Sequence, residues 1–186
     1  MKTEIAFVLD RSGSMQVIRD DAIGGFNSFI AEQKKVPGDA AFSLVFFDDK
    51  YDVIHDRVPL QDVPALTDKT FVPRGSTALL DAIGKTVAAI QSRTADVDKV
   101  ILAILTDGQE NASREFTQAQ IKQTIEQQQA KGWTVLYLGA NQDAFAVGSS
   151  LGVLRGSTVQ YAATAQGVSD AYLQMSCATT RARTAV

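Results

Sequence analysis

The sequence predicts an α/β protein with a doubly wound, mostly parallel central sheet, one antiparallel edge strand and helices on both faces. Four stretches are almost continuously apolar, at residues 5–9, 42–47 (interrupted only by Ser43), 100–105 and 135–138. Continuous apolar runs of this length are typical of parallel strands that are covered on both faces. Segments with helical spacing of apolar residues separate these runs. Strands that alternate with helices in this way form parallel sheets with right-handed crossovers.

Three helices are expected between these strands, because apolar residues recur at intervals of three and four. The first helix should stop before Pro37 and Gly38, and the third near Gly132. Their buried faces are predicted to be formed, in chain order, by Ile18, Ala22, Phe26 and Ile30, by Leu80, Ile83, Val87 and Ile90, and by Ile121 and Ile125.

The remaining elements follow from weaker patterns. Residues 51–60 alternate in polarity after a turn-like Asp-Asp-Lys, which indicates an antiparallel edge strand paired with the second strand. A short helix at 143–147, a short strand at 159–162 and a final helix at 168–176 are expected further on. We therefore predict a single domain over residues 1–178 and a frayed C-terminal tail at 179–186.

Composition excludes several classes of protein. The 186 residues carry a net charge of −3, which leaves no basic footprint for nucleic acid. No apolar run approaches the roughly 18 residues of a membrane span, and Glu4 stands where a signal peptide would continue with its apolar core. The single cysteine, Cys177, excludes an intramolecular disulfide and fits a reducing compartment. We expect a cytoplasmic protein that binds neither membranes nor nucleic acid.

Oxygen-bearing side chains follow the predicted strands. Asp10, Ser12 and Ser14 form an Asp-x-Ser-x-Ser pattern after the first strand, Thr77 lies in the loop before the second helix, and Asp107 follows the strand at 100–105. Ligands of open α/β sheets bind at the carboxyl ends of the strands, so these residues should meet at one edge. Two carboxylates and three hydroxyls suit Mg²⁺ or Mn²⁺, because these cations prefer hard oxygen ligands.

These residues carry a resemblance to a known family. The chain is similar, over nearly all of its length, to the von Willebrand factor type A (VWA) domain, whose metal-ion-dependent adhesion site (MIDAS) has Asp-x-Ser-x-Ser, a later Thr and a later Asp. The resemblance implies a Rossmann-like fold in which Ser12, Ser14 and Thr77 approach the metal directly. Asp10 and Asp107 would act through water. It also implies a protein-binding module whose partner supplies a Glu or Asp to the cation.

The chain resembles one group within that family more than another. It shows no signal peptide, disulfide pair or membrane anchor, which are features of the extracellular adhesion members. It is more similar to the compact intracellular versions of microbes and phages, which often serve AAA+ ATPases, chelatases or stress-response complexes. The resemblance therefore makes an AAA+ ATPase or a stress-response complex a candidate partner.

Simpler interpretations exist for the same residues. The Asp-x-Ser-x-Ser segment could be a capping turn, Thr77 could cap a helix, and Asp107 with Gly108 could form a plain turn. Asp81 is left outside the site, because acids at a helix N-terminus commonly just offset the macrodipole. Arg11 and Arg74 would flank the cleft. Their guanidiniums could be solvated, or they could bind a carboxylate of a partner.

Catalysis is not expected. The chain has no P-loop and no Gly-x-Ser-x-Gly elbow, and Ser12 stands where dehalogenase-like phosphatases need a second acid. The only histidine, His55, lies in the predicted edge strand, so no general base is evident. The alternatives to a metal-dependent binding module are a metal-independent scaffold and a Mg²⁺-dependent phosphohydrolase.

Overall fold

The computed structural model describes residues 2–93 and 96–185. Within these residues, six strands form one sheet in the order β3-β2-β1-β4-β5-β6. The strands are β1 (Thr3–Asp10), β2 (Ala40–Phe47), β3 (Tyr51–Pro59), β4 (Lys99–Thr106), β5 (Thr134–Gly139) and β6 (Thr158–Gln160). Among the described strands, only the pairing of β3 with β2 is antiparallel, which confirms the predicted mostly parallel sheet with one antiparallel edge strand.

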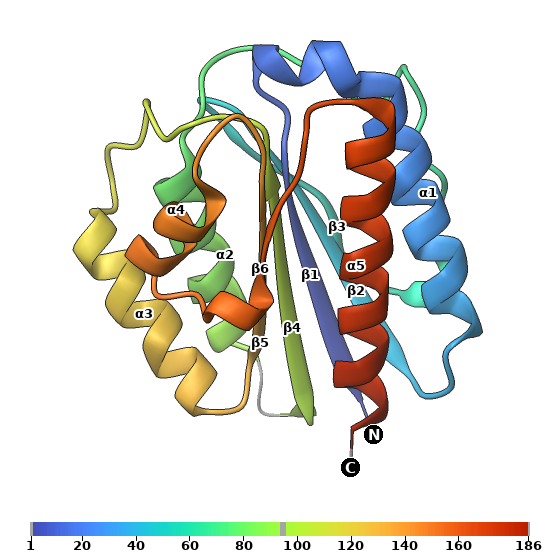
Figure 1. The fold of residues 1–186 in the computed structure, drawn as a ribbon. Helices are drawn as coiled ribbons and strands as arrows, with labels where there is room; N and C mark the ends of the chain where they lie inside the picture. Colours follow the sequence, from blue (N-terminus) through green and yellow to red (C-terminus); the bar gives the residue numbers. More distant parts are fainter. Residues whose placement is uncertain (1, 94–95, 186) are drawn as a thin grey trace.

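Helices cover both faces of this sheet (Figure 1). One face is covered by α1 (Arg19–Lys35) and α5 (Ala165–Thr184), and the other by α2 (Leu79–Gln91), α3 (Gln118–Ala130) and α4 (Ala144–Ser150). Short 3₁₀ turns occur at η1 (Gly13–Ile18), η2 (Leu60–Asp62) and η4 (Arg155–Ser157). No helix in the described parts of the chain combines the length and the apolar character needed to cross a membrane.

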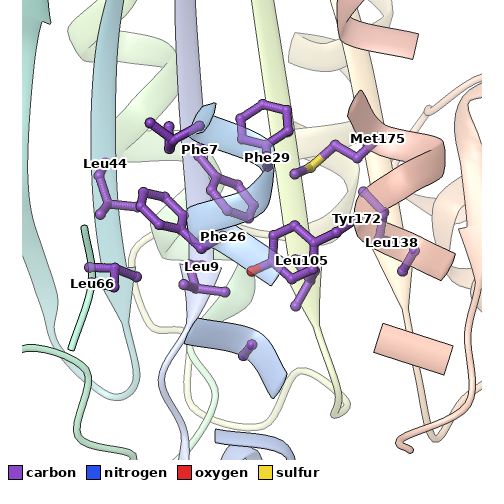
Figure 2. Close-up of a cluster of buried hydrophobic side chains, with 14 of the residues drawn as sticks. Phe7, Leu9, Phe26, Phe29, Leu44, Leu66, Leu105, Leu138, Tyr172 and Met175 are labelled. Atoms are coloured by element: carbon purple, nitrogen blue, oxygen red, sulfur yellow. The ribbon is translucent and has the colours of Figure 1, made fainter. Parts of the chain in front are cut away.

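The central strand β1 is buried along its whole length and divides the core into two layers. Its side chains alternate, so Phe7 faces α1 and α5 while Val8 faces α2 and α3. Phe7 stacks on Phe26 of α1 with ring centroids 5.9 Å apart, and Tyr172 of α5 meets it edge-on at 6.1 Å (Figure 2). This explains why the strand sequence is apolar without alternation.

Register places three strand ends side by side. β1 pairs in parallel with β2 and with β4, with Asp10 opposite Phe47 and Leu9 opposite Leu105. The carboxyl ends of β1, β2 and β4 therefore lie level at the edge of the sheet where η1 begins, at the top of Figure 1. The residues that follow these strands must emerge next to one another.

The edge strand β3 is irregular. Its pairing with β2 shifts register on both sides of Leu44, and Arg57 has a positive φ of 52°. The Arg57 amide donates to the Ser43 hydroxyl at 3.0 Å, and the strand ends at Pro59. A bulge of this kind increases the local twist and interrupts the ladder of hydrogen bonds.

The predicted frayed tail is wrong for residues 179–184, because α5 continues to Thr184. Thr179 is fully buried, and Arg183 is 6% exposed although it lies two residues from the end of the described chain. The Arg183 guanidinium donates to the carbonyls of Gln33 (2.7 Å) and Gly38 (3.0 Å) at the end of α1. The apolar stripe on which the expected helix end was based stops at Met175, whereas polar contacts hold the last turns.

Replacing Arg183 by alanine should destabilise the protein by about 2–3 kcal/mol, because it removes the charged, largely buried donor that joins the end of α5 to the carbonyls of Gln33, Val36 and Gly38. Urea unfolding of Arg183→Ala would measure this loss. Arg181→Ala is the matched control, since Arg181 is exposed on the same helix. Equal stabilities of the two variants would contradict the role assigned to Arg183.

Candidate metal centre

The five residues predicted from the sequence lie at one edge of the sheet. Asp10 is the last residue of β1, and Ser12 and Ser14 follow in the turn that enters η1. Asp107 follows β4 directly, and Thr77 lies in the loop before α2. Four of the five side chains are buried, and Ser14 is exposed to solvent. The cluster is thus reached from outside on the side of Ser14.

Hydrogen bonds connect these residues. The hydroxyl oxygens of Ser12 and Ser14 are 3.2 Å apart, and the Ser14 hydroxyl donates to Oδ1 of Asp107 at 2.7 Å. Thr77 joins the group across Gly108. A Cβ at position 108 would lie 3.7 Å from both the Ser14 and the Thr77 hydroxyl oxygens. The Ser14 and Thr77 hydroxyls therefore both border the space that Gly108 leaves open by having no side chain.

Asp10 forms the inner wall of this cluster. It is fully buried, and its two carboxylate oxygens accept from the Ser12 amide and the Thr106 hydroxyl, each at 2.6 Å. Burial raises the pKa of Asp10 from 3.8 to about 6, and these hydrogen bonds only partly oppose the rise. The charge of Asp107 raises the pKa of Asp10 further, and burial raises the pKa of Asp107 itself. Two poorly solvated carboxylates in one place favour a cation.

The donor set fits a small hard cation. In octahedral coordination at about 2.1 Å, neighbouring ligand oxygens are about 3.0 Å apart, close to the 3.2 Å between the Ser12 and Ser14 hydroxyls. The Ser14 proton is already directed to Asp107, so its lone pairs face away from that carboxylate. Among residues 2–93 and 96–185, no group of three or more His, Cys, Asp or Glu is placed to hold a metal ion. A site here would therefore depend on the hydroxyls.

The position of Thr77 is fixed through its backbone. The Thr77 amide donates to Oδ1 of Asn111 at 2.9 Å, and the Asn111 amide donates back to the Thr77 carbonyl at 3.0 Å. The Gly13 amide donates to the Gly75 carbonyl at 3.1 Å, which ties the Thr77 loop to the turn that carries the two serines. Asn111 therefore has a positioning role that the sequence analysis did not assign.

Two acids anchor the segment after β4 to helix α2. Glu110 accepts from the Leu80 amide at 2.9 Å, and Asp81 accepts from the backbone amides of residues 114, 115 and 116, each at 2.9 Å. Burial alone would raise the pKa of Asp81, but these three amides and Lys85 outweigh it and lower the pKa. Asp81 is thus used to hold the loop, which agrees with leaving it outside the site.

Arg11 and Arg74 converge on Asp48, a fully buried acid directly after β2. Asp48 Oδ2 accepts from Arg11 Nε at 3.0 Å and from Arg74 Nε at 2.9 Å. Arg11 Nη2 also lies 2.6 Å from Asp52 Oδ2. Burial alone would raise the pKa of Asp48, but the guanidiniums and the Lys50 amide lower it overall. Arg11 is 7% exposed, so its guanidinium is occupied inside the protein and does not extend toward a partner.

The roles of Asp48 and Thr106 become visible only when the register of the paired strands is known. Asp48 was assigned to a turn because Asp-Asp-Lys is typical of turns, yet parallel pairing places it level with Arg11. Thr106 is the last residue of β4, and its hydroxyl donates to Asp10, a role that its position in the sequence does not indicate. Once β1 is known to lie between β2 and β4, residues after each strand become neighbours. His55, by contrast, pairs with Leu44 in the middle of β2, away from the carboxyl edge.

The comparisons with known proteins concern the fold. No protein-family model matches the chain, and no curated protein matches it in sequence. Among solved structures, the vWF domain of the type V pili tip protein Mfa5 from Porphyromonas gingivalis is 11% identical, with a TM-score of 0.67 over 95% of this chain and 94% of that one. A von Willebrand factor type A structure from Catenulispora acidiphila is 13% identical, with a TM-score of 0.62 over 96% of this chain and 42% of that one.

Another match carries a metal. Proximal thread matrix protein 1 from the mussel byssus, solved with a zinc-occupied MIDAS motif, is 15% identical to this chain, with a TM-score of 0.68. The match covers 96% of this chain and 46% of the mussel chain, so this chain spans less than half the length of that protein. At these identities the matches establish the fold alone. The chain has a VWA fold, as the resemblance predicted.

The burial of Asp10 predicts an unusual pH dependence for the metal-free protein. The pKa of Asp10 when folded, about 6, lies above its ordinary value of 3.8, so the folded state binds this proton more tightly than the unfolded state. Asp10 then adds stability as the pH falls from about 6 to about 4, and its ionised form costs up to about 3 kcal/mol at pH 7.

Asp10→Asn should therefore be more stable than the wild type at pH 7 in EDTA, and the difference should shrink toward pH 4. Parallel denaturant titrations of the two proteins isolate the contribution of Asp10 from those of the other acids. An Asp10→Asn variant that is less stable than the wild type at pH 7 without metal would show that the carboxylate is not disfavoured there.

Proposed function

We propose that this protein is a metal-dependent protein-interaction module that holds Mg²⁺ or Mn²⁺ with Asp10, Ser12, Ser14, Thr77 and Asp107. The partner would be a protein that offers a Glu or Asp side chain. The observation that carries the proposal is the continuous group of hydroxyl and carboxylate oxygens from Ser12 through Ser14 to Asp107, with Thr77 beside it. A capping turn would need no such convergence of three separate segments.

The buried carboxylates and the hydroxyls would have different roles in binding the cation. Asp10 and Asp107 supply negative charge from inside, where their hydrogen bonds keep them in place. The hydroxyls of Ser12, Ser14 and Thr77 are neutral, so they add oxygen ligands without adding charge. A divalent cation bound here would attract a further carboxylate by its positive charge, and its coordination shell would have room for that ligand. Ser14 lies on the exposed side, where a partner would approach.

The surroundings of the site also favour a protein partner. Val17, in η1 three residues after Ser14, is 81% exposed, and Val72, two residues before Arg74, is 53% exposed. Exposed apolar side chains contribute to protein interfaces because their burial removes them from water. Both belong to segments that form the edge of the sheet where the candidate ligands lie.

Metal binding predicts a specific stabilisation. Mg²⁺ or Mn²⁺ at a hundredfold excess over its Kd should stabilise the wild type by about 2.7 kcal/mol, because it binds only the folded state. The stabilisation should be lost or strongly reduced in Thr77→Ala and retained in Ser76→Ala, an exposed neighbour in the same loop. Thermal melts with and without metal measure this, and a flat response in the wild type would contradict a preformed metal site.

Partner binding predicts a dependence on both metal and surface. Immobilised wild-type protein should retain its partner from an extract of the source organism in Mg²⁺ and release it in EDTA. Thr77→Ala should fail to retain the partner. Val17→Glu should also weaken retention, yet its Mg²⁺ stabilisation should equal that of the wild type, because Val17 contributes no metal ligand. Retention that survives EDTA and Thr77→Ala would favour a metal-independent scaffold instead.

A Mg²⁺-dependent phosphohydrolase is a less favoured alternative than the scaffold, and it makes a different prediction. It requires turnover of a generic phosphoester that depends on Mg²⁺ and is lost in Asp10→Ala. Among the described residues, His55 does not reach the candidate site, which leaves the clustered carboxylates as the available proton acceptors there. The binding module is preferred because the cluster offers ligands for a cation and a docking edge.

A further inference from the structure

We propose that Asp48 is a positioning residue of the metal centre, and that it assembles the two ligand-bearing loops before a cation arrives. This inference rests on the proposed metal site. It concerns a residue that is not itself a ligand. Asp48 lies at the end of β2, between the turn that contains Ser12 and Ser14 and the loop that contains Thr77.

Side-chain contacts connect Asp48 to both loops. Arg11 stands between Asp10 and Ser12 in the motif, and its Nε and Nη2 lie 3.0 and 2.9 Å from Asp48 Oδ2. Arg74 stands three residues before Thr77, and its Nε lies 2.9 Å from the same oxygen. One carboxylate oxygen therefore binds one arginine from each loop, while Oδ1 accepts from the Lys50 amide at 2.6 Å.

Backbone contacts reinforce the same arrangement. The Ala78 amide, one residue after Thr77, donates to the Asp48 carbonyl at 2.9 Å. The Arg74 amide donates to the Arg11 carbonyl at 2.7 Å, so the two arginine-bearing segments also contact each other directly. With these bonds the Thr77 loop is held against the serine-bearing turn by contacts that involve no metal ligand side chain.

Charge and burial explain why Asp48 is effective here. Asp48 is fully buried and Arg11 nearly so, and removing one partner from such a pair leaves an uncompensated charge in the interior. The second acceptor, Asp52, is partly exposed and contacts the arginines from the outside, at 2.6 Å from Arg11 and 3.3 Å from Arg74. The charges of the two carboxylates thus offset the repulsion between the two guanidiniums, which allows both arginines to converge near the site.

The first test uses the metal-free protein. Amide hydrogen exchange should rise by roughly tenfold or more at Gly13, Arg74 and Ala78 in Asp48→Asn, because these amides bond between the segments that Asp48 joins. Asp39→Asn is the control, since it makes the same charge change at an exposed residue just before β2, at the opposite end of that strand. Equal exchange in the two variants would overturn the proposal.

The second test measures Mn²⁺ affinity by electron paramagnetic resonance. Asp48→Asn should weaken binding by roughly tenfold relative to Asp39→Asn, and the loss should be clearly smaller when Arg74 is already glutamine, because Asp48 and Arg74 belong to the same connection. A loss of the same size in the Arg74→Gln background would mean that Asp48 acts independently of the loop that contains Thr77, and the proposal would fall. If Asp48→Asn does not fold, Arg74→Gln tests the same connection at a half-exposed position.

The two proposals fail separately. A wild type that binds no Mn²⁺ would refute the metal centre, whereas the exchange measurement would still decide whether Asp48 holds the loops together. Conversely, Mn²⁺ binding with unchanged exchange and unchanged affinity in Asp48→Asn would support the metal centre and overturn the role of Asp48.

Discussion

The parallel pairing of β1 with both β2 and β4 is the constraint on which the rest of the structure depends. Because the three strands end level, the residues after them are brought together by the hydrogen-bond ladder of the sheet. Asp10, Asp48 and Asp107 thereby reach one edge from positions far apart in the sequence. The loops between them add hydroxyls and arginines, but the sheet determines where those loops start.

This arrangement concentrates negative charge in a poorly solvated place, and the protein handles the two halves differently. Asp48 is neutralised by arginines that belong to the protein, which lowers its pKa despite burial. Asp10 and Asp107 receive only neutral donors, and burial raises the pKa of both. The charge of Asp48 is therefore compensated within the protein, whereas Asp10 and Asp107, with the hydroxyls around them, have the composition of a cation site. The cluster of Asp48 and the two arginines lies beside the candidate cation site and holds the loops that carry its ligands.

Much of the fold could be predicted from the sequence, because buried parallel strands are continuously apolar and their helices have regular spacing. The meeting of the five candidate ligands at one edge could also be predicted, because they follow the ends of parallel strands or lie in an adjoining loop. Their role as ligands is our proposal. These residues are Asp10, Ser12, Ser14, Thr77 and Asp107. What sequence patterns missed are contacts that exist only after pairing. The convergence of arginines on Asp48 and the burial of Arg183 against the end of α1 involve charged residues, which ordinarily indicate solvent exposure.

The irregular edge strand has a consequence for how the molecule meets others. An open sheet edge is a template for strand addition and aggregation unless it is blunted. Here β3 carries a bulge, a positive φ at Arg57 and a terminal proline, and the opposite edge, β6, has only three residues. Neither edge offers a long regular ladder to a second chain. Self-association through the backbone is thereby disfavoured at both edges of the sheet, so that a contact between two copies of the chain would have to be made by side chains.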